Sequence, residues 1–387
     1  MADKILVTDA ELRKSVPIVR SLGRAGLYVV CGSSTRWAPS FFSKYCREAH
    51  IYPDPKDERL FLEWLISNAE RKLFNIVFPI CDSTMAPITK HLDLLQKYMK
   101  IPVVDFSTYM LARDKYQTIQ QAEQSGVPVP KTWGFSSPEE YRARKHEISL
   151  PVVIKPRSSS GSRGVRYVQQ IQDLDDHYYQ IHRNYGLPLI QEYIPPGGDA
   201  LGVGLLCNHG QVLATFMYKR LREYPLSGGP STLRESIYDE NVMKLAIKLM
   251  THMKWHGIAM VEFKVDPRDG TAKLLEVNPR FWGSIALPVV CGVDFPLLLY
   301  ELARGTPKSV NTDYNLHVRC RWLPGDICHF LVNPHRFHLK PSFFDLRNEH
   351  DDLFVRNDIG PIFGTFIALS IHMFQTERWK RYFFRSA

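Results

Sequence analysis

Short apolar runs alternate with helical patterns over about the first hundred residues. Residues 5–7, 27–31 and 76–80 have the continuous apolar character of buried strands. Residues 16–22 and 60–69 repeat their apolar positions at helical spacing. Strands that alternate with helices predict a parallel sheet covered on both faces.

The pattern changes after residue 108. Residues 107–124 predict one helix, which Pro128 and Pro130 prevent from continuing. Antiparallel strands with polar loops follow from 150 to about 303, interrupted by a helix over 242–253. The expected fold class is therefore mixed α/β and α+β. A parallel-sheet domain over 1–108 precedes a two-lobed, mostly antiparallel domain over 109–310 (lobes 109–190 and 191–310) and a C-terminal, helical extension over 311–387.

Composition favours a globular protein that binds anions. Of 387 residues, 44% are hydrophobic and 12% aromatic, and the formal net charge is +9. The charge is spread along the chain without a run of five basic residues, so we expect no nucleic-acid partner.

The seven cysteines are scattered, without CxxC spacing, and no HExxH motif is present. Zinc, haem attachment and a disulfide framework therefore have no support. The N-terminus does not resemble a signal peptide, and the apolar stretch 362–374 is too short to span a bilayer. We expect a cytoplasmic protein with reduced cysteines.

A predicted hairpin carries the strongest chemical signal. Its strands, 259–265 and 273–280, flank a three-residue loop that ends in Gly270, and this register places Glu262 directly opposite Glu276. Asn278 then lies on the same face, while Val261, Phe263, Leu275 and Val277 face the core. Opposed carboxylates repel, and Mg²⁺ resolves the conflict. The alternative is a solvated face on which Lys264 balances Glu262.

Two further segments combine strands with polar loops. A strand ending at Lys155 runs into a Ser- and Gly-rich loop, 157–164, whose backbone N–H groups suit anionic oxygens. A strand over 189–192 runs into Pro and Gly and exposes a backbone edge suited to adenine. Asp82 and Ser83 follow a strand's carboxyl end, where such sheets bind ligands, although helix capping explains them equally well. Each segment alone is equally consistent with an ordinary turn or loop.

Taken in order along residues 1–305, these elements resemble the ATP-grasp superfamily, which includes biotin carboxylase and the carbamoyl phosphate synthetase large chain. The resemblance implies ATP with two Mg²⁺ ions, or Mn²⁺ in their place. It implies metal ligands (Glu262, Glu276, Asn278), ATP contacts (Lys115, Lys155, Ser160, Gly161, Gly164, Glu192, Tyr193, Ile194, Asp199) and catalytic cations (Arg280, Lys155, Lys219, Arg220).

The polar stretch 218–236 resembles the loop that carboxylate–amine ligases of this type carry beside the active site. Gly228, Gly229 and Ser231 are expected to contact substrate there, with Asp82 and Ser83; an ordinary solvated loop is the alternative.

The C-terminal residues 362–387 combine an apolar stretch with an aromatic and basic cluster at 378–385. One interpretation is a segment that contacts an anionic membrane at its inner face; the other is a helix packed on the core.

The function implied by the resemblance is an ADP-forming ligase. A small-molecule carboxylate becomes an acyl phosphate and an amine then displaces phosphate. Alternatives are phosphoryl transfer or bicarbonate-dependent carboxylation on the same fold, and a catalytically silent ATP-binding regulator. A homodimer is expected, as for most soluble enzymes.

Overall fold

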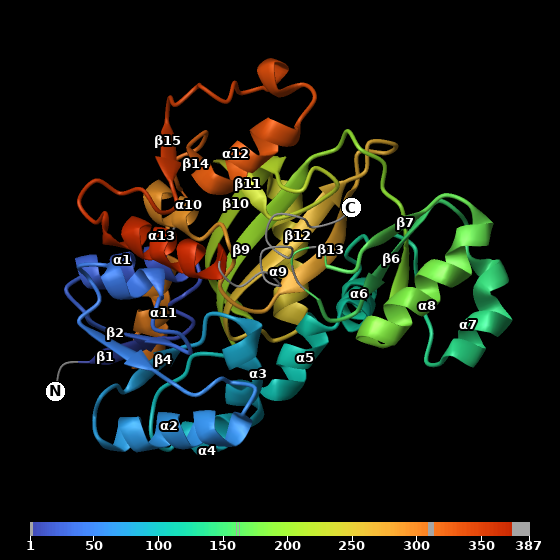
Figure 1. Ribbon diagram of the computed structural model, residues 1–387. Coiled ribbons are helices and arrows are strands. Elements are labelled where there is room, and N and C mark those ends of the chain that lie inside the picture. Colours follow the sequence, from blue (N-terminus) through green and yellow to red (C-terminus); the bar gives the residue numbers. More distant parts are fainter. Residues whose placement is uncertain (1–2, 160, 162, 309–312, 374–387) are drawn as a thin grey trace.

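The computed structural model describes residues 3–159, 161, 163–308 and 313–373. Three sheets organise this part of the chain (Figure 1). They follow one another along the sequence, so each belongs to a separate stretch of chain. The mixed α/β and α+β class expected from the sequence is confirmed.

The N-terminal sheet is parallel, with strand order β3-β2-β1-β4. Its strands are β1 (Lys4–Val7), β2 (Tyr28–Ser33), β3 (Glu48–Ile51) and β4 (Ile76–Phe78), and its helices are α1 (Ser15–Arg24), η1 (Pro39–Phe42), α2 (Glu58–Glu70), α3 (Asp82–Lys90) and α4 (Leu92–Leu95). Leu6, Val30 and Val77 pack on the α2 side, whereas Ile5 and Val7 pack on the α1 side. Both faces of the sheet are therefore covered, as predicted.

The single helix predicted over 107–124 is wrong, because two helices occupy this stretch. The helices are α5 (Phe106–Arg113) and α6 (Lys115–Gln124), and Asp114 stands between them. The Asp114 carboxylate accepts bonds from the N–H groups of Tyr116 (2.8 Å) and Gln117 (3.3 Å) and so caps α6. The break makes Lys115 the first residue of a helix.

The second sheet is a small antiparallel one of order β5-β8-β6-β7. It contains β5 (Thr132–Gly134), β6 (Val152–Pro156), β7 (Arg166–Val168) and β8 (Pro188–Glu192), with α7 (Pro138–Arg144), η2 (Lys145–Glu147), η3 (Ile171–Asp173) and α8 (Leu174–Tyr185). Tyr141 of α7 stacks on Tyr178 of α8, with ring centroids 3.6 Å apart. These rings join the core beneath one face of the sheet.

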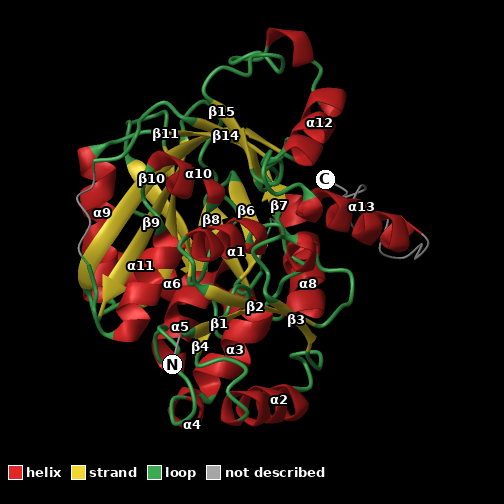
Figure 2. Cartoon of the chain, turned by 90° about the vertical axis from the view of Figure 1, so that its left-hand side faces the viewer, coloured by secondary structure: helices red, strands yellow, loops and turns green. Residues whose placement is uncertain are grey.

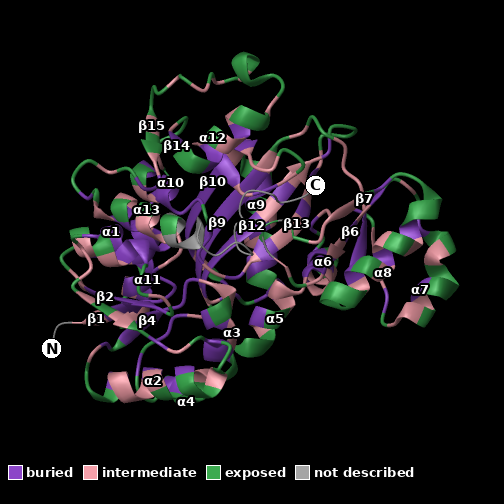
Figure 3. Ribbon diagram, viewed as in Figure 1, coloured by how far each residue is buried: buried purple, intermediate pink, exposed green. Residues whose placement is uncertain are grey.

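The third sheet has seven strands in the order β13-β12-β9-β10-β11-β14-β15. They are β9 (Ala200–Asn208), β10 (Gln211–Glu223), β11 (Ser231–Ser236), β12 (Gly257–Val265), β13 (Ala272–Asn278), β14 (Arg319–Arg321) and β15 (Glu349–Asp351). Helix α9 (Glu240–His252) packs on one face, while α10 (Ala286–Cys291), α11 (Phe295–Arg304) and the N-terminal unit pack on the other (Figure 2). The large sheet is thus the buried centre of the molecule (Figure 3).

The C-terminal region is more than a helical extension. It contains α12 (Leu323–Val332), η4 (Arg336–His338) and α13 (Gly360–Met373), and it also adds β14 and β15 to the large sheet. Helix α13 lies on η1, so close that a Cβ at Gly360 would stand 1.9 Å from the carbonyl oxygen of Phe42. The described part of this helix therefore packs on the protein, as the second of the two interpretations has it.

No helix in the described part of the chain is long and apolar enough to cross a membrane. The aromatic and basic cluster at 378–385, on which the predicted membrane contact depends, lies outside the described residues.

Candidate active site

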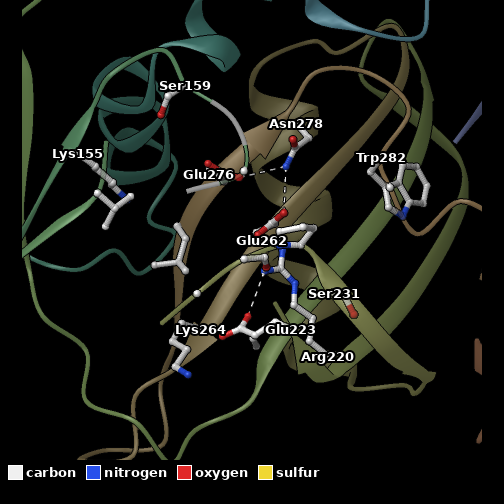
Figure 4. A pocket seen from close by; sticks show the side chains of 18 of the residues that line it. Lys155, Ser159, Arg220, Glu223, Ser231, Glu262, Lys264, Glu276, Asn278 and Trp282 are labelled. Atoms are coloured by element: carbon white, nitrogen blue, oxygen red, sulfur yellow. Dashed lines mark hydrogen bonds and ion pairs between the residues drawn. The ribbon is translucent and has the colours of Figure 1, made fainter. Parts of the chain in front are cut away.

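A cleft of about 780 Å³ opens where the two antiparallel sheets face each other and the N-terminal unit closes one end. Strands β6 and β8 supply one wall, and β10, β12 and β13 supply the other. Figure 4 shows charged side chains from both walls directed into this space. Most residues that were predicted to bind ATP, metal or substrate line the cleft.

Glu262 and Glu276 lie directly opposite each other on β12 and β13, as predicted. The Asn278 amide lies between them, and its Nδ2 donates to Glu262 Oε1 (3.1 Å) and Glu276 Oε1 (3.4 Å) (Figure 4). Burial, and after it the charge of Glu276, raises the pKa of Glu262 despite the neighbouring Arg220. Glu276 behaves oppositely: Lys115 overcomes the effect of burial and lowers its pKa. Each carboxylate has one cationic partner, Arg220 for Glu262 and Lys115 for Glu276.

The core position predicted for Leu275 is wrong. A register shift follows the Glu262–Glu276 pair, so that Phe263 faces Leu274 instead. Leu274 takes the buried core position, and Leu275 lines the cleft. The turn is also longer than three residues, since Asp266 N–H bonds the carbonyl oxygen of Thr271 (2.8 Å).

Two lysines approach the glutamates, Lys155 from β6 on the opposite wall and Lys115 from the start of α6, which packs against β13. Lys115 Nζ lies 2.9 Å from Glu276 Oε2 and donates to the carbonyl oxygen of Ser159 (2.7 Å). Lys155 Nζ donates to Gln191 Oε1 (2.8 Å). Burial, then the charge of Lys115, lowers the pKa of Lys155 to about 8. Both ammonium groups are placed to meet anionic oxygens between the walls.

The Ser- and Gly-rich loop lies at the mouth of the cleft, where Ser159 and Gly161 line it. Ser160 lies outside the described residues. Gly164 does not line the cleft: at φ +77 its Cα stands against Pro156 and Tyr185, and a Cβ there would approach Pro156 Cγ to 2.8 Å. Gly164 therefore serves the turn and its close packing, and its position does not agree with the predicted contact to ATP.

Glu192, Tyr193 and Ile194 line the cleft where β8 ends. The Glu192 carboxylate pairs with Arg268 and accepts from the N–H of Lys131 (3.2 Å). Its carboxylate is therefore already engaged, and its N–H donates to the carbonyl oxygen of Lys131 (2.8 Å). Asp199 is exposed and is absent from the lining, so its predicted ribose contact is not supported by its position.

Strand β10 divides its charged residues between two faces. Arg220 enters the cleft and pairs with Glu262, whereas Lys219 points the other way and lies 3.7 Å from Glu235. Lys219 is therefore an incorrect prediction for a catalytic cation, because alternation along the strand turns it out of the cleft. A register shift beyond Arg220 returns Glu223 to the lining.

The β10–β11 turn closes over the cleft from the second lobe. Gly228, Gly229 and Ser231, for which substrate contacts are predicted, all line the cleft. The Tyr167 hydroxyl of β7 donates to the carbonyl oxygen of Ser227 (2.7 Å), so this turn bonds directly to the first lobe.

Arg280 lines the cleft beside the N-terminal unit, and its Nε donates to Asp82 Oδ2 (2.9 Å). Neither Asp82 nor Ser83 lines the cleft, because Ser83 bonds Asp9 Oδ1 (3.1 Å) and Asp82 lies behind Arg280. Asp82 positions the guanidinium and does not face the substrate directly, which corrects both predicted contacts.

Several lining residues were missed by the sequence reasoning. Arg13, Lys14 and Cys81 come from loops at the carboxyl ends of β1 and β4. The rule that drew attention to Asp82 applies equally to the loop after β1, so this signal was available. Glu223 lies within the polar stretch 218–236 that was expected beside the active site, whereas Tyr167, Lys264 and Trp282 gave no comparable signal, because only the folded lobes bring them to the cleft.

The donor set fits a divalent cation held between protein and phosphate. Two opposed carboxylates and a neighbouring amide are hard oxygen ligands of the kind Mg²⁺ prefers. The described residues contain no group of three His, Cys, Asp or Glu side chains that could hold a metal by itself. A site with two carboxylates needs further oxygens, and the phosphates of a nucleotide supply them.

Two lobes that enclose a cleft, with paired glutamates and two lysines inside it, are the arrangement expected of an enzyme that binds a nucleotide. Residues 112–284 match the family model for the ATP-grasp domain. The resemblance predicted from the sequence is confirmed.

The chain is similar to D-aspartate ligase of Enterococcus faecium, with 22% identity over 306 residues that cover 73% of this chain and 72% of that protein. It is also similar to acetyl-CoA carboxylase of Dictyostelium discoideum, at 24% identity over 49% of this chain, a match that spans only 9% of that much longer protein. Biotin carboxylase from Campylobacter jejuni has a similar fold, with TM-score 0.68, 19% identity, and coverage of 82% of this chain and 74% of that one.

Proposed function

We propose that this chain is an ADP-forming ligase that activates a carboxylate with ATP and joins it to an amine. The opposed Glu262 and Glu276, facing Lys115 and Lys155 across one cleft, carry the proposal. The name of the D-aspartate ligase relative supports a ligase that acts on an acid, and the ATP-grasp match supports the nucleotide. The predicted units 1–108, 109–310 and 311–387, a homodimer and a cytoplasmic location stay predictions.

The adenine binds between the lobes in this proposal. Val153 and Val165 of the first lobe and Leu275 of the second line the cleft and offer apolar faces, and the backbone at Ile194, which also lines it, would bond the adenine. The phosphates then extend past Lys155 and Lys115 toward the glutamates. Glu262, Glu276 and Asn278 would hold two Mg²⁺ ions, with Mn²⁺ as the substitute, and the metal would offset the charge of the phosphates and of the attacking carboxylate.

The protein's own groups then order the chemistry. Arg280 orients the substrate carboxylate toward the terminal phosphate, and attack gives an acyl phosphate and ADP. The amine attacks the acyl carbon, phosphate leaves, and Arg280 and Arg220 stabilise the oxyanion formed between these events. The bond from Tyr167 to Ser227 keeps the lobes together, which limits hydrolysis of the acyl phosphate by water.

The test is ADP release from Mg²⁺ and ATP, screened against pooled acids with and without pooled amines. We expect release that needs both pools and falls in Glu276→Gln. The matched control is Glu240→Gln, since Glu240 is an exposed glutamate that does not line the cleft. Release with an acid alone would identify a phosphoryl-transfer enzyme, release with bicarbonate alone a carboxylase, and tight ATP binding without release a regulator.

A further inference from the structure

The end of the cleft formed by the N-terminal unit is lined by three cations. Arg13 and Lys14 come from the loop before α1, and Arg280 follows β13. The carboxylates nearest to them, Asp82 and Asp352, do not line the cleft. Positive charge therefore faces the cavity while the balancing negative charge lies behind it.

Lys14 and Arg280, two like charges, share one hydrogen-bond acceptor. Lys14 Nζ (2.8 Å) and Arg280 Nη1 (3.2 Å) donate to the same carbonyl oxygen, that of Phe281. The shared acceptor keeps the two positively charged groups next to each other. A second bond from Lys14 Nζ to the carbonyl oxygen of Ile80 (2.6 Å) fixes the ammonium. Burial, then the charge of Arg280, lowers the pKa of Lys14 to about 8. An anion bound to both groups would relieve this repulsion.

Arg13 forms a second cationic position farther along the same segment. Its guanidinium carbon lies 4.6 Å from the centre of the Trp322 ring, and its Nη1 bonds Asp352. Asp352 also bonds Arg234, whose Nε and Nη1 are buried without a hydrogen-bond partner. Asp352 thus bonds two guanidinium groups, and of these three residues Arg13 is the one that lines the cleft.

We infer that the acid substrate carries two anionic groups: its reacting carboxylate binds Lys14 and Arg280, and a second carboxylate or phosphate binds Arg13. The inference rests on the proposed function for the identity of the reacting group. Trp322 and Asp352 act as positioning residues, because they hold the Arg13 side chain from behind. The C-terminal region consequently takes part in substrate choice although neither of these two residues lines the cleft.

The experiment compares acids with their neutral amide isosteres at the remote end. Dissociation constants are measured by calorimetry for aspartate and asparagine, glutamate and glutamine, and succinate and succinamate, with 3-phosphonopropionate as the phosphate arm. Each titration is done with and without Mg²⁺ and a non-hydrolysable ATP analogue. We expect at least one dianion to bind about ten- to a hundredfold more tightly than its amide, as for a charge-assisted hydrogen bond.

Variants separate the two positions. Arg13→Leu should abolish the preference for the dianion, whereas Lys14→Met should weaken acid and amide alike. Arg13→Lys retains the charge and tests whether a loss arises from misfolding. Arg24→Leu changes an exposed arginine at the end of α1, the helix that follows Arg13, and this arginine does not line the cleft.

Equal binding of every dianion and its amide, or a preference that survives in Arg13→Leu, would overturn the inference. A preference that depends on Arg13 would support it even if no acid and amine pair releases ADP, and that combination would count against the ligase proposal alone.

Discussion

Two arginines, two positions apart on β10, form ion pairs of very different character. Arg220 bonds Glu262 inside the cleft, where a second carboxylate competes for cations. Arg222 makes two bonds to Asp326 of α12 (2.8 and 2.9 Å), and Asp326 also accepts from the Thr232 hydroxyl (2.9 Å). The side chain of Asp326 is fully buried, and that of Arg222 nearly so.

The two ion pairs differ in the other groups that surround each carboxylate. The Arg222–Asp326 pair has its hydrogen bonds satisfied by the protein, so it fastens the C-terminal region to the large sheet. The Arg220–Glu262 pair lines an open cleft and would be rearranged by metal and phosphate. In this protein, the buried ion pair whose hydrogen bonds are all made within the protein stabilises the fold. The pair that lines the cleft is instead placed to bind a ligand.

The largest effect should come from Arg222→Met. The change leaves Asp326 with fewer bonds in a buried position, and we expect the free energy of unfolding to fall by about 3 to 5 kcal/mol. Denaturant unfolding measures this loss. The double variant Arg222→Met/Asp326→Leu should recover part of it, because no buried charge is then left without its partner; a single variant as stable as the parent protein would contradict the comparison.

Glu276→Gln should act on turnover and leave stability nearly unchanged. Loss of one metal-binding carboxylate is expected to lower ADP formation by roughly 10²-fold, and to weaken the dependence of ATP affinity on Mg²⁺. Thermal unfolding without nucleotide provides the second measurement. A drop in unfolding free energy as large as that expected for Arg222→Met would show that the cleft carboxylates also stabilise the fold.

Arg220→Met and Lys219→Met test neighbouring cations on opposite faces of one strand. Arg220→Met should lower turnover by about ten- to a hundredfold, the range for losing one hydrogen bond to a charged group. Lys219→Met should change neither turnover nor stability beyond about 0.5 kcal/mol, as for an ordinary surface substitution. Steady-state kinetics on the pair checks the assignment, and equal losses would refute it.

The smallest effect concerns pH. The pKa of Lys155 is lowered to about 8 from its ordinary value of 10.5, so the folded protein releases this proton before the unfolded chain does. The stability contribution is present above pH 10.5 and is lost as the pH falls through about 8. We expect unfolding free energy without nucleotide to rise by on the order of 1 kcal/mol between these values, because solvent in the cleft reduces the full effect. Lys155→Met should abolish this rise, and Lys219→Met should keep it.

The alternation of apolar and polar residues was enough to predict the fold class and the hairpin. Glu262 and Glu276 are opposed as predicted, but for a different reason: the turn is longer than the predicted three residues, and the extra residue at Leu275 restores the pairing. The same local rules failed at Leu275, where an extra residue in the strand changes which side chain faces the core. They also failed at Asp114, which ends one helix and caps the next.

The sequence by itself determined the order of the elements, because local periodicity fixes it, and it indicated the opposed glutamates and Lys155 at the end of a strand; Lys115 was indicated only by the resemblance to the ATP-grasp superfamily. Only the tertiary structure decided that Lys219 leaves the cleft, that Asp82 stands behind Arg280, and that the loop before α1 completes the site. Those outcomes depend on contacts between residues far apart in the chain. The bond between Asp352 and Arg13, which are far apart in the sequence, is the clearest example. Such a pairing of charges forms only in the folded protein and produces no local sequence pattern.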